Sequence, residues 1–439
     1  MNSRRLTRVA TAASTLVLLS SVAACGSSGP SAGGGGGGGG GSAQVWALQD
    51  PVLNPIEQGS IDRFADSTDS DVEFELATFG NDPYKQRLRT AIGSPQAPDL
   101  FFNWGGGNLK EYVDAGKIED LTPLLDENPE VRDAFLPSVL NGAVLDGKNY
   151  GLPMRGMQPV VLFYNKAVLD EAGVSVPTTW DELLTAVDGL NAAGKTPIAL
   201  AGNQPWTELM WAEYLLDRVG GPEVFQNIRD GVNGGWEQPQ VLEAMTMLTD
   251  LIQNHDAFGD EFASVGYDVG GASTILARGD AGFHLMGTWE YTNQLDQQPD
   301  FVTSGDLGYT LFPAVTGGAG DPSNLVGNVS NFYSLTADSE NKDAAEEFLT
   351  TQLTSDEYVT SLIEAGDVPP VAGVRDQLES GDNADYTTFV YDATVEASNF
   401  QLSWDQDLSA DQATQMLESL SRLFLGELDA QGFIDSLAG

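Results

Sequence analysis

A single cysteine, Cys25, constrains the fold of this 439-residue chain more than any other feature. An internal disulfide is impossible, and only His255 and His284 are present to build a Cys/His metal site. Because single cores stop growing at about 250–300 residues, a chain of this length is expected to form two lobes. The sequence predicts no metal and no cofactor.

The N-terminus is typical of an exported protein. Arg4, Arg5 and Arg8 precede an apolar stretch at 9–22, and small residues follow it. The stretch is too short and too rich in Ala and Ser for a membrane-spanning helix. Residues 1–24 are therefore predicted to be a signal peptide.

The end of this segment, Val22-Ala23-Ala24-Cys25, resembles a bacterial lipobox, in which cleavage precedes the cysteine and the thiol receives a lipid. The alternative is an ordinary signal peptide with a coincidental cysteine. Residues 26–42 contain an unbroken glycine run and are predicted to be a flexible tether with a reach of about 20–25 Å. The resemblance implies a protein anchored through Cys25 on the outer face of the cell membrane.

The charge of the chain limits its partners. Twenty basic residues against 64 acidic ones give a net charge of −44. Nucleic acid is excluded because binding it needs a basic surface. An anionic ligand would be repelled by the negative charge of the protein unless arginines at its site offset that charge. The net charge does not disfavour a neutral ligand. The high charge also favours a soluble monomer.

Short strands alternate with helices along the chain. Strands are predicted at 44–48, 72–77 and 99–102, and a helix is predicted after Thr179, with Glu182 completing a capping box. Another helix follows Asn341. This alternation predicts α/β lobes with mainly parallel sheets.

Short motifs are spread over nearly the whole chain beyond the tether. They lie at 97–102 (APDLFF), 105–107 (GGG), 150–153 (YGLP), 162–166 (LFYNK), 176–183 (VPTTWDEL), 282–289 (GFHLMGTW) and 341–349 (NKDAAEEFL). In this order and spacing, the chain resembles the extracellular solute-binding proteins of bacterial carbohydrate ABC importers, of the maltose-binding-protein-like type.

The resemblance implies a two-lobe α/β fold of the periplasmic-binding-protein type II, with a hinge and a ligand cleft between the lobes. The first lobe would comprise residues 43–157 and 329–372, and the second lobe 158–328 and 373–439. The implied partners are the permease subunits of an ABC transporter, and no chemistry on the ligand is implied.

Tryptophans supply the first group of candidate site residues. A sugar ring presents apolar C–H faces and a hydroxyl rim, so its site needs flat aromatic rings and planar polar groups. Trp180, Trp211 and Trp236 are expected to be structural. The other five lie beside turn-forming or amide-bearing residues: Trp46, Trp104, Trp206, Trp289 and Trp404. The resemblance places Trp104, Trp289 and Trp404 against sugar faces, whereas Trp46 fits core or ligand equally.

Polar side chains in turns supply the second group. Carboxylates accept strong hydrogen bonds from hydroxyls, and Arg155 in the first crossover would donate across the cleft. Arg155 would alternatively brace acidic side chains, and the asparagines would alternatively satisfy turn backbones. The candidates are Asp50, Asn103, Arg155, Asn203, Glu208 and Asn328.

The leading hypothesis is a binding protein that hands a neutral oligosaccharide to a permease. Several tryptophans suggest two or more stacked rings. Among carbohydrate-binding relatives, the chain is most similar to binding proteins for β-linked disaccharides and short oligosaccharides such as xylobiose or chitobiose. This resemblance implies a ligand of that class, with xylo-oligosaccharides favoured. The alternatives are a secreted glycoside hydrolase, which would need two carboxylates at a defined separation, and an adhesion or scaffold lipoprotein without a ligand.

Overall fold

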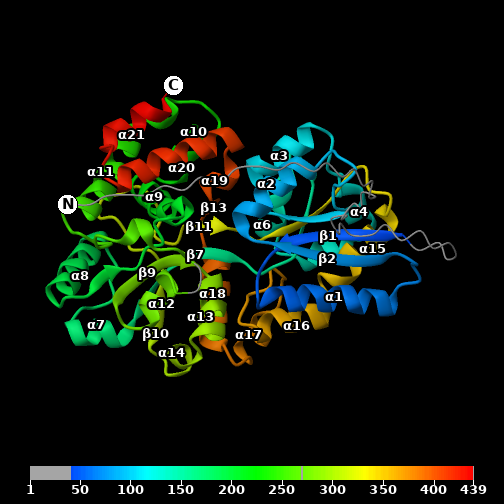
Figure 1. Cartoon of the computed structure of the whole chain (residues 1–439), viewed down its shortest axis with the longest axis horizontal. Coiled ribbons are helices and arrows are strands. Elements are labelled where there is room, and N and C mark those ends of the chain that lie inside the picture. Colours follow the sequence, from blue (N-terminus) through cyan, green and yellow to red (C-terminus); the bar gives the residue numbers. More distant parts are fainter. Residues whose placement is uncertain (1–40, 268–269, 439) are drawn as a thin grey trace, which may run out of the picture. The chain divides into compact units, whose positions relative to one another are not determined.

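The computed structural model describes residues 41–267 and 270–438, which form two lobes that each contain a larger sheet (Figure 1). The signal peptide, Cys25 and the tether up to residue 40 lie outside the described residues. The first sheet has the strand order β2-β1-β3-β12-β6. Its strands are β1 (Ser42–Leu48), β2 (Glu73–Phe79), β3 (Leu100–Asn103), β6 (Leu152–Pro153) and β12 (Phe332–Leu335). Strands β1 to β3 are parallel and confirm the three predicted strands, whereas β12 is antiparallel to β3 and β6.

The second sheet has the order β13-β11-β7-β9-β8, with β10 paired to β7. Its strands are β7 (Gln158–Asn165), β8 (Thr196–Ile198), β9 (Ala281–Gly287), β10 (Leu307–Thr310), β11 (Leu325–Asn328) and β13 (Phe400–Leu402). Strand β7 runs antiparallel to β9, β10 and β11. The prediction of mainly parallel sheets is therefore wrong for this lobe, because β7 enters directly from the other lobe instead of through a helical crossover.

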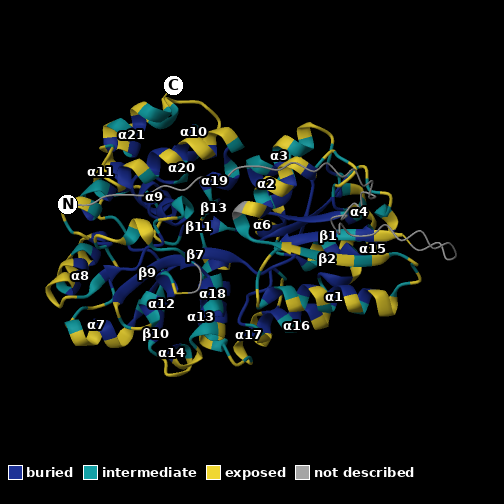
Figure 2. Cartoon of the chain, viewed as in Figure 1, coloured by how far each residue is buried: buried dark blue, intermediate teal, exposed yellow. Residues whose placement is uncertain are grey.

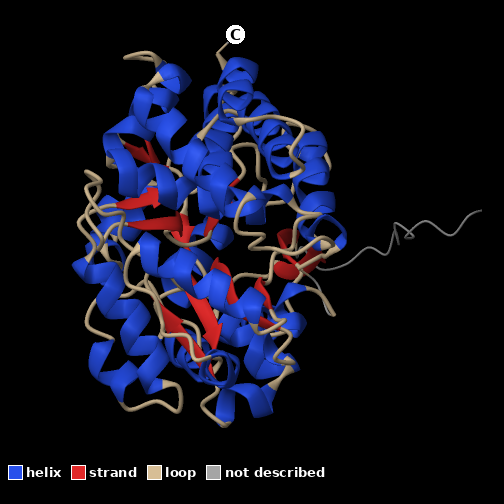
Figure 3. Cartoon of the chain, turned by 90° about the vertical axis from the view of Figure 1, so that its left-hand side faces the viewer, coloured by secondary structure: helices blue, strands red, loops and turns tan. Residues whose placement is uncertain are grey.

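Helices lie on the outside of the molecule. Figure 3 shows strands inside and helices outside, and Figure 2 shows exposed residues on the outer faces of helices such as α1. A small hairpin joins β4 (Val144–Leu145) to β5 (Lys148–Asn149). The helical segments of the first lobe are α1 (Leu53–Ser67), α2 (Asn81–Ala91), α3 (Gly106–Asp114), α4 (Thr122–Glu127), α5 (Pro129–Ala134), α6 (Pro137–Leu140), η1 (Asn141–Ala143), α15 (Lys342–Gln352) and α16 (Asp356–Glu364).

The second lobe is built around helix α9 (Pro205–Gly220), which is buried along almost its whole length. Helices α10 (Pro222–Arg229), α11 (Pro239–Gln253), α19 (Trp404–Asp407) and α20 (Ala410–Phe424) contact it. The other helical segments of this lobe are α7 (Lys166–Ala172), α8 (Trp180–Ala192), η2 (Gly235–Glu237), η3 (Phe262–Ser264), α12 (Ala272–Ala277), α13 (Trp289–Gln297), α14 (Pro299–Thr303), α17 (Arg375–Glu379), α18 (Ala384–Glu396) and α21 (Ala430–Leu437). The capping box of Thr179 and Glu182 is confirmed. Across residues 41–267 and 270–438, helices long and apolar enough to cross a bilayer are absent.

The chain crosses between the sheets along segments that lie side by side. The Met157 amide donates to the Val368 carbonyl at 2.9 Å, and the Met154 amide donates to the Asn331 carbonyl at 2.8 Å. The Gly156 amide also donates to Asp367 Oδ2 at 2.9 Å. Three segments that cross between the lobes, near 154–158, 328–332 and 366–370, therefore lie side by side and are joined by hydrogen bonds. The lobe boundaries after residues 157, 328 and 372 stay a prediction.

Candidate ligand-binding site

A cleft of about 770 Å³ is lined by residues of both lobes. On the first lobe, its lining begins where β1, β2 and β3 end, with Leu48, Thr78 and Phe102 among the residues. On the second lobe, it includes residues from the first turns of α9, α13 and α19. The carboxyl ends of parallel strands are where open α/β sheets bind ligands, and the volume falls in the range of about 300–1,000 Å³ typical of small-molecule sites.

Aromatic rings line the cleft from both lobes. On the second lobe, the Trp206 ring lies 5.6 Å from Tyr267 and 6.2 Å from Trp289, measured between ring centroids. On the first lobe, Trp104 packs edge-to-face on Phe102 at 4.9 Å. Because each cluster supports its own rings, the indoles are held in place as flat apolar surfaces.

Charge inside the cleft is paired. Arg155 is almost completely buried, and its guanidinium lies 2.7 Å from Glu57 Oε1 and 3.8 Å from Asp50 Oδ2. Burial opposes the charge, but Glu57 and Asp50 together hold the pKa of Arg155 above its ordinary value. Lys85 forms a second pair with Asp405 at 3.6 Å. The lining therefore holds two acidic and two basic side chains in a protein with a net charge of −44.

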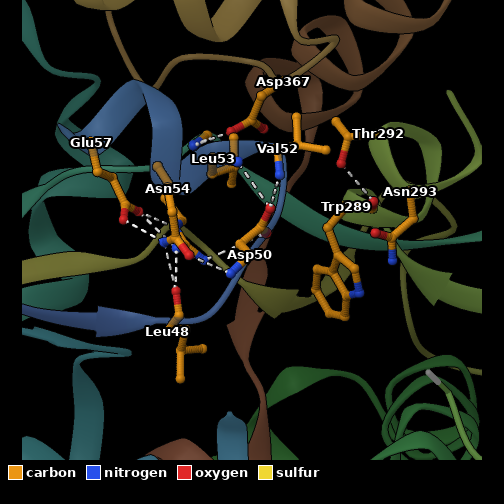
Figure 4. A network of polar contacts seen from close by, with 12 residues as sticks. Leu48, Asp50, Val52, Leu53, Asn54, Glu57, Trp289, Thr292, Asn293 and Asp367 are labelled. Atoms are coloured by element: carbon orange, nitrogen blue, oxygen red, sulfur yellow. Dashed lines mark hydrogen bonds and ion pairs between the residues drawn. The ribbon is translucent and has the colours of Figure 1, made fainter. Parts of the chain in front are cut away.

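A network of hydrogen bonds at the start of α1 holds Asp50 and its neighbours in place. Asp50 Oδ1 accepts hydrogen bonds from the amides of Val52 and Leu53, each at 2.9 Å. Asn54 donates to the Leu48 carbonyl at 2.8 Å and to Glu57 Oε2 at 2.7 Å. Figure 4 shows this network with Trp289 and Asn293 nearby. Hydrogen bonds within the protein thus fix the groups of this face, and such preorganisation lowers the entropy that a site loses on binding.

Carboxamide side chains are the commonest polar groups of the lining. Each carries both donors and acceptors, as hydroxyl recognition requires. Asn328 Oδ1 is buried and has no hydrogen-bond partner among the described residues. The carboxamides are Gln49, Asn54, Asn81, Gln158, Gln204, Asn293, Gln297, Asn328, Asn331 and Gln406.

The structure brings six of the predicted site residues together. Two of them follow β1 and β3, one lies in the first crossing segment, and three lie on α9, α13 and β11, so they are scattered in sequence but share one cleft. These residues are Asp50, Trp104, Arg155, Trp206, Trp289 and Asn328. Their contact with a ligand stays a prediction. The sequence allowed two roles for Arg155, donation to a ligand or bracing of acidic side chains. The geometry matches the second role, because the guanidinium is paired with Glu57 and Asp50.

Two predicted residues of the first lobe lie outside the cleft lining. Trp46 is buried in β1, where its ring packs edge-to-face on Phe79 at 5.2 Å. Asn103 is buried, and its amide donates to Ser334 Oγ at 2.7 Å and accepts from the Gly105 amide at 2.9 Å. Both side chains therefore stabilise the first sheet and the turn after β3.

Three predicted residues of the second lobe also lie outside the lining. Glu208 is 1% exposed and accepts a hydrogen bond from Ser421 at 2.7 Å. Burial raises its pKa to about 7. Trp404 is 1% exposed and stacks on Phe225 at 4.8 Å, which turns the indole into the lobe. Asn203 is exposed on the turn before α9, beyond the lined surface.

Sequence reasoning missed several lining residues. Asn293 lies one helical turn after Trp289 on α13, so helical spacing could have indicated it. Asp405 and Gln406 follow Trp404 directly and reach the cleft that Trp404 does not. Tyr267 lies in a segment without periodicity, and no local signal pointed to it. The described residues contain no cluster of three His, Cys, Asp or Glu side chains that could hold a metal.

Comparison with known proteins identifies the family. The model of a family described as bacterial extracellular solute-binding protein matches residues 50–359. The chain belongs to the bacterial extracellular solute-binding proteins. This solute-binding protein is 27% identical to the diacetylchitobiose binding protein DasA of Streptomyces coelicolor over 310 residues, which cover 70% of the chain and 68% of DasA. It is 28% identical to the xylose/arabinose-binding protein XacG of Haloferax volcanii over 220 residues, 46% of each chain. It thus spans about half the length of XacG.

Solved structures show the same fold. One comes from a study of xylan utilization by the thermophilic bacterium Caldanaerobius polysaccharolyticus, with a TM-score of 0.79 and 24% identity, covering 90% of this solute-binding protein and 98% of that chain. Another is a chitin oligosaccharide binding protein, with a TM-score of 0.80 and 23% identity, covering 91% and 98%. At these identities the likeness establishes the two-lobe type II fold alone.

Proposed function

We propose that this solute-binding protein captures a neutral oligosaccharide outside the cell and delivers it unchanged to the permease subunits of an ABC importer. The observation that carries the proposal is the cleft itself. Its charged side chains are paired with each other, its aromatic rings lie on both lobes, and its remaining polar groups are mainly carboxamides.

Each part of the cleft matches one part of a sugar. The rings of Trp104, Trp206 and Trp289 supply flat apolar surfaces for C–H faces. Carboxamides donate to and accept from hydroxyls, and a sugar lacking a required hydroxyl would leave a buried amide unpaired. A charged ligand would instead have to compete for Arg155 or Lys85, which already have carboxylate partners.

Among sugars, we propose a β-linked disaccharide or short oligosaccharide, with xylo-oligosaccharides preferred. Support comes from the similar structure solved in the xylan study and from aromatic rings on both lobes, which suit more than one sugar ring. Similar proteins that bind diacetylchitobiose and chitin oligosaccharides make diacetylchitobiose the direct competitor. The two differ in chemistry, because the acetamido groups of chitobiose need their own amide partners and extra room.

We further propose that the crossing segments act as a hinge at the predicted lobe boundaries, and that closure buries the sugar. The lipobox-like Val22-Ala23-Ala24-Cys25 and the glycine run support anchoring of the mature protein on the outer membrane face. A tether would keep the binding lobes near the permease that they serve.

Calorimetry with xylobiose, xylotriose, cellobiose, maltose and diacetylchitobiose tests the proposal. We expect one or more of these sugars to bind with 1:1 stoichiometry and to be recovered intact. A Trp206→Ala variant should bind more weakly, whereas Trp236→Ala, at a partly buried tryptophan beyond the cleft lining, should not. Failure of every sugar to bind would reject the function. Tighter binding of diacetylchitobiose would reject only the preference for xylo-oligosaccharides.

A further inference from the structure

Besides the crossing segments, the two lobes touch directly where α3 of the first lobe meets α19 and the start of α20 of the second. Asn108 Nδ2 donates to the Asp405 carbonyl at 2.9 Å and to Gln406 Oε1 at 3.1 Å. One helical turn further along α3, Glu111 Oε1 accepts from the Ala410 amide at 3.1 Å. These bonds join elements that follow strands of different sheets.

The approach is close because the first turn of α3 is made of glycine. Gly106 has a φ of +63°, in the left-handed region that other residues rarely adopt. Gly107 has an ordinary φ, but a Cβ atom there would lie 2.4 Å from the Asp407 carbonyl oxygen and 2.7 Å from that of Leu408. The backbone of one lobe thus rests on the backbone of the other with no side chain between them.

This contact borders the cleft. Asp405 and Gln406, which receive the bonds from Asn108, also line the cleft, as do Lys85 and Trp104 on the opposing lobe. The Lys85–Asp405 ion pair at 3.6 Å spans the same gap. Any hinge motion that widens the cleft at this border must therefore separate α3 from α19.

We propose that α3 and α19 form an interlobe latch, which separates when the cleft opens and re-forms over a bound sugar. The proposal rests on the proposed function for the ligand, but the latch itself needs only the motion of the lobes. Its bonds suit reversible use: Glu111 is exposed and Asn108 is partly exposed, so water replaces each partner when the lobes part. Since the latch forms only in the closed state, it stabilises the sugar complex without touching the sugar.

Gly107→Ala tests the latch. Gly107 lies outside the cleft lining, and alanine suits a helix better than glycine does, so the sugar-free open protein should fold normally. In the closed state the added methyl would wedge the lobes apart. Gly59→Ala is the matched control, because Gly59 lies in α1 and a Cβ there meets only the end of the Arg63 side chain, at 3.4 Å.

Thermal unfolding without sugar and calorimetry with the best sugar give the two readouts. A latch predicts that Gly107→Ala leaves the sugar-free Tm within about 2 °C of Gly59→Ala and raises the Kd by roughly tenfold or more, because the closed state is less populated. Glu111→Ala should also weaken sugar binding. Asp114→Ala should not, because Asp114 accepts a hydrogen bond from Lys110 within its own lobe.

The outcomes are distinct. A fall of several degrees in the sugar-free Tm would show that α3 and α19 stay packed in every state and would overturn the latch. An unchanged Kd in Gly107→Ala would overturn it as well. If the wild-type protein bound no sugar, the proposed function would fail, whereas a fall of several degrees in the sugar-free Tm of Gly107→Ala would still be needed to overturn the latch.

Discussion

Gly287 offers a way to displace Trp289 without removing it. Gly287 ends β9, and a Cβ atom built there would lie 1.9 Å from Trp289 Cζ3 and 2.2 Å from Cη2. Its φ lies outside the left-handed region, so the backbone accepts alanine. Gly287→Ala should therefore act almost entirely through the indole that lines the cleft.

The size of the displacement follows from these distances. An ordinary contact begins at 3.4 Å, so the indole must retreat by about 1.5 Å from the new methyl. A gap of 0.5–1 Å already forfeits about a quarter to a half of a dispersion contact. Loss of the whole ring in Trp289→Ala should cost about 2 kcal/mol of binding free energy, or about 30-fold in Kd. Gly287→Ala should cost about 1–2 kcal/mol, or about 5- to 30-fold.

A double-mutant cycle provides the assay. Calorimetry of the wild-type protein, Gly287→Ala, Trp289→Ala and the double variant gives four binding free energies for the same sugar. Because both changes act on one side chain, the double variant should bind no more weakly than Trp289→Ala, with a coupling energy of about 1–2 kcal/mol. Thermal unfolding of each variant checks that the second lobe remains folded.

Two results would refute this reasoning. Wild-type affinity in Gly287→Ala would mean that the position of the indole does not matter to the ligand. Additive losses in the double variant would mean that Gly287→Ala acts through the backbone or another neighbour, and the contact with Trp289 would no longer explain its effect.

Further predictions concern charge and location. Burial raises the pKa of Glu208 from 4.5 to about 7, so the contribution of this carboxyl to stability should fall by about 3 kcal/mol as pH rises through this range. Urea unfolding should show that Glu208→Gln loses less stability than the wild-type protein over the same range, by about this amount. Arg155→Met should lower stability by about 3–5 kcal/mol by stranding buried Glu57, and adding Glu57→Gln should restore part of it. Sugar Kd should change less than about twofold between 50 and 500 mM NaCl, because the charges of the cleft are already paired. Cys25→Ser should move the protein from membranes to the medium in cell fractionation.

The sequence predicted those parts of the site that depend on local context. Trp289 follows a strand and a Gly-Thr turn, and such positions face the cleft at a sheet end. Trp404 has a similar setting, beside a turn and an amide, yet its indole faces inward. The difference is Phe225 on α10, a stacking partner far away in sequence whose position no local pattern reveals.

The same limit applies to the fold. The two-lobe α/β architecture followed from length, alternation and family motifs, and β1 to β3 were placed correctly. The mixed second sheet was missed because the direction of β7 depends on where the chain leaves the other lobe. Asn103 was assigned to the ligand, but its amide holds the turn at Gly105. A polar residue near a strand end thus serves either the ligand or the backbone, and only the fold decides which.

The position of β12 has a consequence for biosynthesis. This strand lies between β3 and β6 in the first sheet, but it is made long after both and after most of the second lobe. A nascent chain that stops short of β12 carries an unpaired strand edge and an open core, so it cannot complete either half as a separate contiguous fragment. Interleaving of this kind delays final folding until nearly all of the polypeptide has been synthesised.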